Sequence, residues 1–318
     1  MRSSEKRLLI AKIVCVVAIA IALAFKLFGT ASFTASRPPV PLTSSPGSVN
    51  TDPAFYNGST TAEVVHPSNA THAPAPKPQI TASAYVVGNV VTGKIYLQKN
   101  ASVVLPVASM SKLITAIAAT DTLSPDTRIQ ITDQEYDVAS DTSKIVPRES
   151  FTVLELLYPM LLNSSNVAAE ALASTTDRAK FMELMTSYAW EVGMPSTFFA
   201  DPSGINPRNQ STASDFFALA RYLYKYRPDI LAITRIPRIS VATTTDHMAH
   251  DFISIHPFVS DPAFLGGKTG HTPEAGDTML TIMKIAGQPV AIVILGADSG
   301  NRERDTRLLI SKTTEAIQ

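Results

Sequence analysis

The 318-residue sequence predicts an α/β (α+β) domain in which strands near both ends form one antiparallel sheet and a block of helices lies between them in the chain. Residues 84–87 and 94–97 are two short apolar runs separated by a polar, glycine-containing break. Residues 279–285 and 290–295 surround an Ala-Gly-Gln-Pro turn, which is typical of a β-hairpin. Between these two pairs the apolar residues follow mainly helical spacing.

Helical periodicity predicts the elements between the strand pairs in order. The expected helices are residues 112–123, 153–162, a helix beginning over 167–173, 177–192, 214–224 and, at the C-terminus, 304–317. Residues 130–132 and 151–152 are expected to be short edge strands or loops. Residues 163–166 then connect two buried helices, where short polar side chains can face a cleft.

Composition excludes several classes of protein. Acidic and basic residues number 27 each, whereas a nucleic-acid binder normally has a basic excess. The only cysteine, Cys15, lies in the N-terminal apolar run, so the exported part can form neither an internal disulfide nor a cysteine metal site. We expect no nucleic-acid partner, no cofactor and no metal.

The first 30 residues are predicted to be a membrane anchor or a signal peptide. Basic residues precede an apolar stretch, Leu8 to Phe28, that is long enough to span a bilayer with Lys12 and Lys26 snorkelling. The charge distribution favours a cytoplasmic N-terminus, with the rest of the chain outside. A retained anchor is the favoured interpretation, and a signal peptide cleaved near Gly29–Ala31 is the alternative.

Residues 31–80 are predicted to be a disordered linker rich in Pro, Ser and Thr. Nine of the chain's 22 prolines fall between residues 31 and 79, and apolar periodicity is absent there. A flexible chain of this length averages roughly 35–40 Å end to end. We expect it to hold a catalytic domain, residues 81–318, away from the membrane.

Three short motifs indicate what that domain does. They are Ser-Met-Ser-Lys at residues 109–112, Ser-Ser-Asn at 164–166 and Lys-Thr-Gly at 268–270. Each pattern alone is weak, since residues 3–6 also fit the first. Together, in this order, they supply a nucleophilic hydroxyl, two lysines, a polar bridge and a cationic strand. This combination predicts covalent acyl transfer on a peptide that ends in a free carboxylate.

The context of the first motif supports this interpretation. A strongly helical run, residues 113–119, follows it directly. Ser109 is therefore expected at or just inside a helix N-terminus, near unpaired N–H groups and the positive end of the helix dipole. A spacing of three residues places Lys112 on the same face, within reach of the serine proton.

The motifs and their surroundings resemble the D-alanyl-D-alanine carboxypeptidases, the low-molecular-mass penicillin-binding proteins that trim cell-wall peptides. The resemblance covers most of residues 82–318. Besides the motifs it includes Thr92–Tyr96, Asn100–Ala101, Leu161–Leu172, Asp201–Gly204, Ser211–Ala213 with Asp215, and Gly266–Gly276.

This resemblance implies the penicillin-recognising serine transpeptidase/β-lactamase-like fold. It also implies a serine-type D-Ala-D-Ala carboxypeptidase of the bacterial cell envelope, which removes the terminal D-alanine from peptidoglycan stem peptides through an acyl-enzyme. β-Lactam antibiotics would then be acylating inhibitors.

By this similarity Ser109 is the nucleophile and Lys112 the base that removes its proton. Lys112 must then be neutral part of the time, which requires desolvation or a nearby cation such as Lys268. The resemblance makes Ser164 the relay that passes the proton to the leaving D-alanine. It makes Asn166 the residue that holds the substrate amide and orients Lys112.

The same similarity assigns substrate-binding residues. Lys268 and Thr269 would meet the terminal carboxylate, and Gly270 would let the ligand backbone approach closely. Backbone N–H groups of the nucleophile and of His271 would form the oxyanion hole. Arg302 aligns with an arginine that the family uses near the carboxylate.

Two positions depart from the family pattern. Ser111 stands where threonine is usual, and Ser165 replaces the usual glycine of the middle motif. The second change places two hydroxyls side by side, so Ser164 or Ser165 could relay protons. A D,D-endopeptidase that cleaves peptide cross-links, and a catalytically silent wall-binding protein, remain alternative functions. A β-lactamase is disfavoured, since no Glu-x-x-x-Asn stretch offers a deacylating carboxylate.

Other polar clusters are expected to lie at the surface. His247 and His250 have a spacing that could bind a metal, but no third ligand is evident, so a polar surface loop is predicted. Glu303, Asp305 and the arginines beside them are predicted to form the solvated face of the last helix.

Overall fold

The computed structural model describes residues 79–138 and 141–317. The predicted anchor or signal peptide, residues 1–30 with the apolar stretch 8–28, lies outside the described residues, as does the linker up to residue 78. Among the residues that are described, none of the helices has the length and apolar character needed to cross a membrane.

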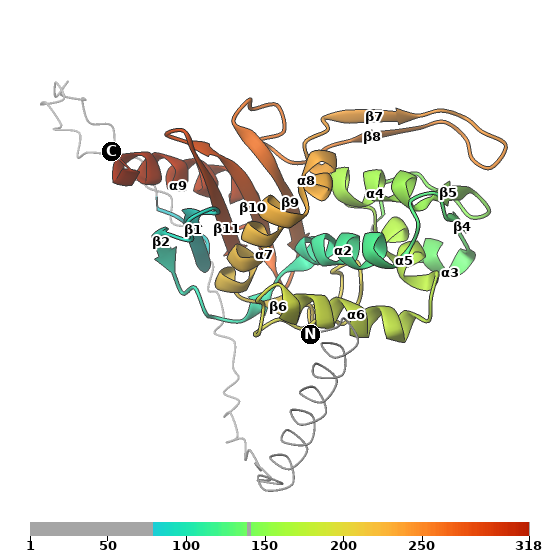
Figure 1. The fold of residues 1–318 in the computed structure, drawn as a ribbon, viewed down its shortest axis with the longest axis horizontal. Helices are drawn as coiled ribbons and strands as arrows, with labels where there is room; N and C mark the ends of the chain where they lie inside the picture. The colour runs from blue at the N-terminus through green and yellow to red at the C-terminus, as the bar shows by residue number, and fades with distance from the viewer. Residues whose placement is uncertain (1–78, 139–140, 318) are drawn as a thin grey trace, which may run out of the picture. The chain divides into compact units, whose positions relative to one another are not determined.

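Five strands form one antiparallel sheet in the order β2-β1-β11-β10-β9 (Figure 1). They are β1 (Ala84–Asn89), β2 (Ile95–Lys99), β9 (Phe264–Thr272), β10 (Gly276–Ile285) and β11 (Gln288–Ala297). The first strand pairs with the last, with Val86 opposite Val293. The predicted sheet of N- and C-terminal strands is therefore confirmed. β9 forms one edge of the sheet.

Helices and three small strand pairs make up the rest of the described chain. The helices are η1 (Ala108–Ser111, a 3-10 helix), α2 (Lys112–Thr122), α3 (Asp133–Tyr136), α4 (Val153–Leu162), α5 (Asn166–Ser174), α6 (Arg178–Glu191), α7 (Ala213–Tyr226), α8 (Pro228–Thr234) and α9 (Arg302–Ile317). The pairs are β3 (Leu105–Pro106) with β6 (Gln210–Ser211), β4 (Arg128–Gln130) with β5 (Ser150–Thr152), and β7 (Arg238–Val241) with β8 (His250–Ile253).

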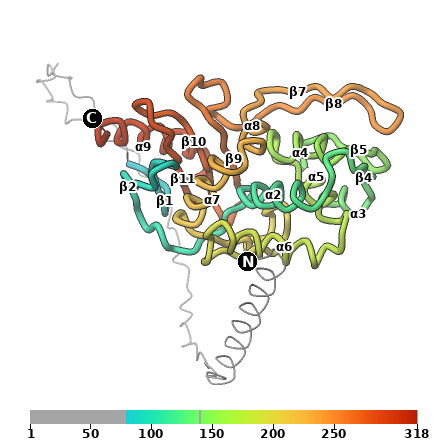
Figure 2. The backbone as a smooth tube through the Cα atoms, in the orientation of Figure 1, coloured from blue at the N-terminus to red at the C-terminus, as the bar shows by residue number. Residues whose placement is uncertain are grey.

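The sheet is covered on both faces because its side chains alternate between them. Val86 and Val293 belong to the larger core, shared with α7 and the helical block. Val87, Ile292 and Ile294 belong to a smaller core that includes Leu309 of α9. In Figures 1 and 2, α9 follows the outer face of the sheet, and α7 separates the opposite face from α2 and α5. The result is a sheet between a single helix and a helical block.

Local capping fixes where the helices nearest the cleft begin. Thr152 caps α4, since its hydroxyl accepts from the Glu155 backbone N–H while the Glu155 carboxylate accepts from the Thr152 N–H at 2.8 Å. Ser165 caps α5 by accepting from Ala168 N–H at 3.0 Å. Asn163 ends α4, so only a short connection joins the two helices, and it lines the cleft.

The loop between β7 and β8 is largely exposed, as predicted, but the prediction of a surface position is wrong for the side chains of His247 and His250. His247 is buried and stacks on Phe151 with ring centroids 4.6 Å apart. His250 Nε2 lies 2.9 Å from Glu149 Oε1. The β7–β8 hairpin, which the periodicity did not predict, packs these imidazoles against Phe151 of β5, where ring stacking replaces solvation.

The prediction of a solvated face is wrong for Asp305. Its side chain is fully buried, and its Oδ2 accepts from the N–H groups of Thr81 and Ala82, both at 2.8 Å. The carboxylate therefore ties the chain just before β1 to α9. Glu303 and Arg307 do form an exposed ion pair at 2.8 Å, as expected for that face.

Candidate active site

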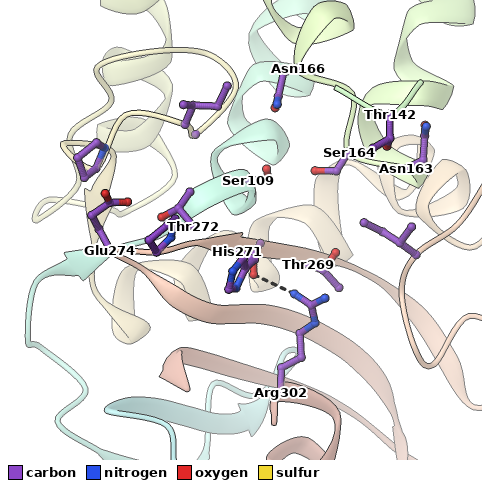
Figure 3. Close-up of a pocket in the computed structure, with 16 residues that line it drawn as sticks. Ser109, Thr142, Asn163, Ser164, Asn166, Thr269, His271, Thr272, Glu274 and Arg302 are labelled. Carbon is purple, nitrogen blue, oxygen red and sulfur yellow. Dashed lines mark hydrogen bonds between the residues drawn. The ribbon is translucent and has the colours of Figure 1, made fainter. Parts of the chain in front are cut away.

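A cleft of about 520 Å³ lies between the helical block and the exposed edge of β9 (Figure 3). Ser109 lines it from η1, which precedes α2 directly. The residue before the serine, Ala108, has φ 49°, and Ser164 across the cleft has φ 66°. Non-glycine residues in this region are strained, and such strain is concentrated at functional sites. Ser164 thus has a strained backbone conformation itself, and Ser109 directly follows a residue that has one.

Lys112 is completely buried and directed at the serine. Its Nζ lies 3.0 Å from Ser109 Oγ and 2.7 Å from Asn166 Oδ1, and it also donates to the Ser203 carbonyl oxygen. The i, i+3 relation that the sequence predicted between Ser109 and Lys112 spans the junction of η1 and α2. The amine is therefore positioned from three separate segments of the chain.

Burial is the main influence on the protonation of Lys112. It lowers the pKa of Lys112 from 10.5 to about 7, although the negative charges of Asp201, Asp141 and Glu170 partly oppose the shift. Of the two causes expected from the sequence, desolvation dominates, and Lys268 is not among the principal influences on this pKa. At neutral pH a large fraction of Lys112 is uncharged and can accept a proton.

Lys268 occupies the opposite side of the same centre. It is almost fully buried, and its Nζ donates to Ser164 Oγ at 2.9 Å and to the Thr269 carbonyl oxygen at 2.8 Å. Burial, and then the positive charges of Lys112 and Arg302, hold the pKa of Lys268 well below its ordinary value. A ligand carboxylate placed beside this amine would favour its protonated form.

The two serines of the middle motif have different surroundings. Ser164 Oγ contacts Lys268 and lines the cleft. Ser165 is fully buried and donates to Asp141 Oδ2 at 2.7 Å while it caps α5. Of the alternatives left open by the sequence, the geometry favours Ser164 as the hydroxyl that a substrate can reach.

The strand β9 brings the carboxylate-binding candidates together. Thr269, Gly270 and His271 line the cleft in sequence, and Arg302 at the start of α9 donates to the Gly270 carbonyl oxygen at 3.0 Å (Figure 3). Asp277 of β10 accepts from His271 Nδ1 at 2.9 Å. Every site residue predicted from the sequence therefore lies at this one centre.

Gly270 is required where β9 meets η1. A Cβ at this position would lie 2.4 Å from Thr278 Oγ1 and 3.0 Å from both Ser109 N and Val107 O. The strand can approach the nucleophile this closely only without a side chain. This contact holds the N–H of Ser109 beside the edge of β9, where the N–H of His271 follows.

Asp201 is a positioning residue that the sequence analysis missed. Its carboxylate accepts from the N–H and hydroxyl of Ser203 and from the N–H groups of Gly204 and Asn206. This loop fixes the Ser203 carbonyl oxygen that receives Lys112. Gly204 has φ 88°, and a Cβ there would lie 2.1 Å from the Ala108 carbonyl oxygen. The resemblance included this stretch, but no spacing rule indicated its role.

Asp141 supports the middle motif in a similar way. Its Oδ2 accepts from Ser165 Oγ and from the Val167 N–H, both at 2.7 Å, and its Oδ1 accepts from the Ser143 N–H. Although burial acts in the opposite direction, these hydrogen bonds hold the pKa of Asp141 below its ordinary value. An anionic Asp141 therefore keeps the α4–α5 connection in place.

Within residues 79–138 and 141–317, no group of three His, Cys, Asp or Glu side chains is arranged to hold a metal ion. The chemistry available at the cleft is that of a hydroxyl, two amines with low pKa values and backbone N–H groups. Fold and site together define a serine peptidase of the penicillin-recognising class.

The comparisons with known proteins identify the family. Residues 69–299 match the family described as D-alanyl-D-alanine carboxypeptidase, and the chain belongs to it. It is 29% identical over 209 residues to the D-alanyl-D-alanine endopeptidase of Haemophilus influenzae, with 64% of this chain and 70% of that relative covered. It is 28% identical over 231 residues to a D-alanyl-D-alanine carboxypeptidase of Bacillus subtilis, with 68% and 57% covered.

A solved structure supports the same assignment. The fold is similar to that of a penicillin-binding protein of Listeria monocytogenes in a cefotaxime-bound form, at 29% identity and a TM-score of 0.65, covering 76% of this chain and 100% of that one. The chain is thus a serine-type D-Ala-D-Ala carboxypeptidase by family. Peptidases of this family act on the cell wall, so they function in the cell envelope.

Proposed function

We propose that this chain removes the terminal D-alanine from peptidoglycan stem peptides through an acyl-enzyme formed on Ser109. The observation that carries the proposal is the 3.0 Å contact between Ser109 Oγ and a buried amine, Lys112 Nζ, whose pKa is about 7. A neutral amine at this distance is a general base for the serine proton.

The proposed reaction assigns one step to each of these groups. Ser109 Oγ attacks the carbonyl carbon of the penultimate D-alanine as Lys112 takes its proton. The N–H groups of Ser109 and His271 stabilise the developing oxyanion. The C–N bond breaks, and Ser164 relays to the leaving amine the proton that Lys112 took, which leaves Lys112 neutral again. Water then hydrolyses the ester, with Lys112 again accepting the proton.

Substrate binding is proposed for the groups around β9. The terminal carboxylate would be held by the protonated Lys268, by Thr269 and by Arg302, as charge-assisted hydrogen bonds are the strong ones. Asn166 lines the cleft, and its Oδ1 orients Lys112 by accepting a hydrogen bond from it. In the proposed complex Asn166 would also hold the substrate amide. β-Lactams carry a carboxylate and a reactive carbonyl in a similar relation, so they would acylate Ser109.

Labelling with a fluorescent penicillin tests the nucleophile. The purified catalytic domain should be labelled covalently, and its Ser109→Ala variant should not. Ser102 is an exposed serine in the same stretch, so the Ser102→Ala variant should be labelled as strongly as wild type. Persistent labelling of Ser109→Ala would contradict the assignment.

Substrate preference is tested with two peptides. Release of free D-alanine from a pentapeptide ending in D-Ala-D-Ala supports the carboxypeptidase activity. Faster cleavage of a cross-linked dimer would favour a D,D-endopeptidase, the activity named for the Haemophilus influenzae relative. Cleavage of neither peptide by the folded domain would favour a catalytically silent wall-binding protein.

We also propose that residues 8–28 anchor the chain in the membrane and that residues 31–80 tether the catalytic domain outside it. The basic residues that precede the uninterrupted apolar residues 13–25 support this proposal. The mature N-terminus, determined by mass spectrometry, should begin within the first residues of the chain. A mature chain beginning near residue 31 would show a cleaved signal peptide instead.

A further inference from the structure

The cleft extends beyond the groups that the proposed reaction uses. β9 is an edge strand whose residues Thr269 to Thr272 line the cleft, so an extended peptide can add along this side of the strand. With the terminal carboxylate at Thr269 and the scissile carbonyl near Ser109, a peptide antiparallel to β9 runs toward Thr272. The residue that precedes D-Ala-D-Ala therefore lies near the turn between β9 and β10.

That turn places a carboxylate at this end of the cleft. Glu274 lines the cleft from the turn, and in Figure 3 its side chain lies beyond Thr272 and His271, at the far side from Ser164. Glu274 is exposed, and no hydrogen bond or ion pair holds its carboxylate among the described residues. Its carboxylate is thus available to a ligand.

The charges around the cleft are segregated. Among the residues that line it, Arg302 carries a positive charge and Glu274 the only negative charge. Arg302 lies at the carboxylate end with Lys268, whereas Glu274 lies at the acyl end. A ligand with a terminal carboxylate and an ammonium group upstream is electrostatically complementary to this arrangement.

The dimensions agree with such a ligand. From Thr269 to Thr272 the strand rises roughly 10 Å, and Glu274 lies two positions further, in the turn. In an extended peptide, the residue before D-Ala-D-Ala lies roughly 7 Å from the terminal residue. The four-carbon stem of a lysine-like side chain extends about 5 Å away from the peptide axis. Its ammonium group and the side chain of Glu274, which extends from the neighbouring turn, can therefore meet beside the end of β9.

We propose that Glu274 is a specificity-determining residue that binds the side-chain ammonium of the diamino acid preceding D-Ala-D-Ala in the substrate. This inference rests on the proposed function, since it requires the peptide to run antiparallel to β9. A cross-link that acylates the same amine removes its charge. The contact therefore selects stem peptides whose own side-chain amine is not acylated.

The test compares two acyl-X-D-Ala-D-Ala peptides that differ only in X, which is lysine or Nε-acetyl-lysine. The quantity measured is the ratio of their kcat/KM values from D-alanine release. Wild type should prefer the lysine peptide about threefold to fivefold, since an exposed ion pair contributes modestly. Glu274→Gln should reduce the ratio to about 1. Glu315→Gln, an exposed glutamate of α9, should keep the wild-type ratio.

Charge reversal provides a second variant. Glu274→Lys should prefer a peptide with glutamate at X over one with lysine, and Glu274→Asp should retain part of the wild-type preference. The wild-type ratio should also fall as salt is raised. A ratio that Glu274→Gln and Glu274→Lys leave unchanged would overturn the inference.

The two proposals fail differently. If wild type hydrolyses both peptides at the same rate, only the role of Glu274 is wrong. If wild type hydrolyses neither, the carboxypeptidase function itself is wrong, whatever Glu274 does.

Discussion

Lys112 Nζ lies 3.0 Å from Ser109 Oγ, and the same amine donates to the carbonyl oxygen of Ser203, in a loop nearly a hundred residues further along the chain. Since a carbonyl oxygen cannot take up the proton, this second contact orients the lysine without competing for its role as a base. The loop that contains Ser203 therefore fixes the position of the amine, while burial lowers the pKa of Lys112.

The rate of acylation by penicillin should rise with pH and level off above a midpoint near 7. Below this pH Lys112 is protonated and cannot accept the serine proton, and above it the amine is neutral, because burial lowers its pKa to about 7. Stopped-flow measurement of the acylation rate constant between pH 5 and 9 checks this. A rate independent of pH across that range would exclude Lys112 as the base.

Asp201→Asn should shift that midpoint to lower pH. The carboxylate of Asp201 favours the protonated lysine, so its removal lowers the pKa of Lys112 further. The maximal rate should also fall, by about tenfold or more, because the Ser203 carbonyl loses its support. The control is Asp215→Asn, another buried aspartate, which accepts from Thr197 Oγ1. It should leave the midpoint in place.

Gly270→Ala should abolish penicillin labelling while the domain stays folded. The new methyl group would press on Thr278 Oγ1 and on the backbone of Val107 and Ser109, which displaces the nucleophile. Gly287→Ala, in the β10–β11 turn, meets nothing within 4 Å but has φ 76°. It should lower stability by about 1 kcal/mol and leave labelling intact. Labelling of Gly270→Ala at the wild-type rate would contradict the close approach of β9.

Arg302→Gln should raise KM for a peptide with a free C-terminal carboxylate by about tenfold, which is what a lost charged hydrogen bond costs. A peptide ending in a carboxamide offers no charge to this arginine. The variant should therefore change KM for the amide much less than for the acid. Equal effects on both peptides would mean that Arg302 acts only through its hydrogen bond to Gly270.

Asp305→Ala should destabilise the domain by about 2–4 kcal/mol, because the N–H groups of Thr81 and Ala82 lose a buried acceptor. Glu303→Ala, two residues earlier and paired only with exposed Arg307, should change stability by less than about 1 kcal/mol. Chemical denaturation of the two variants compares them directly. Similar losses in both would contradict the anchoring role of Asp305.

Local patterns predicted much of the fold. The apolar run from Val153 to Leu162 matches α4, and the hairpin around residues 286–289 joins β10 and β11. The α8 helix and the β7–β8 hairpin were missed. His247 and His250 are polar by type, yet stacking on Phe151 and pairing with glutamates bury them. Residue type alone does not reveal that such contacts will offset the loss of hydration when a histidine is buried.

The sequence by itself determined the order of the motifs, the spacing of Ser109 and Lys112 and the helix beneath them, since these depend on neighbours a few residues apart. Only the tertiary structure decided which serine of the middle motif faces Lys268, and that Asp201 and Asp141 hold the lysine and the α4–α5 connection. Those choices arise when distant segments are packed together and each buried polar group must find a partner.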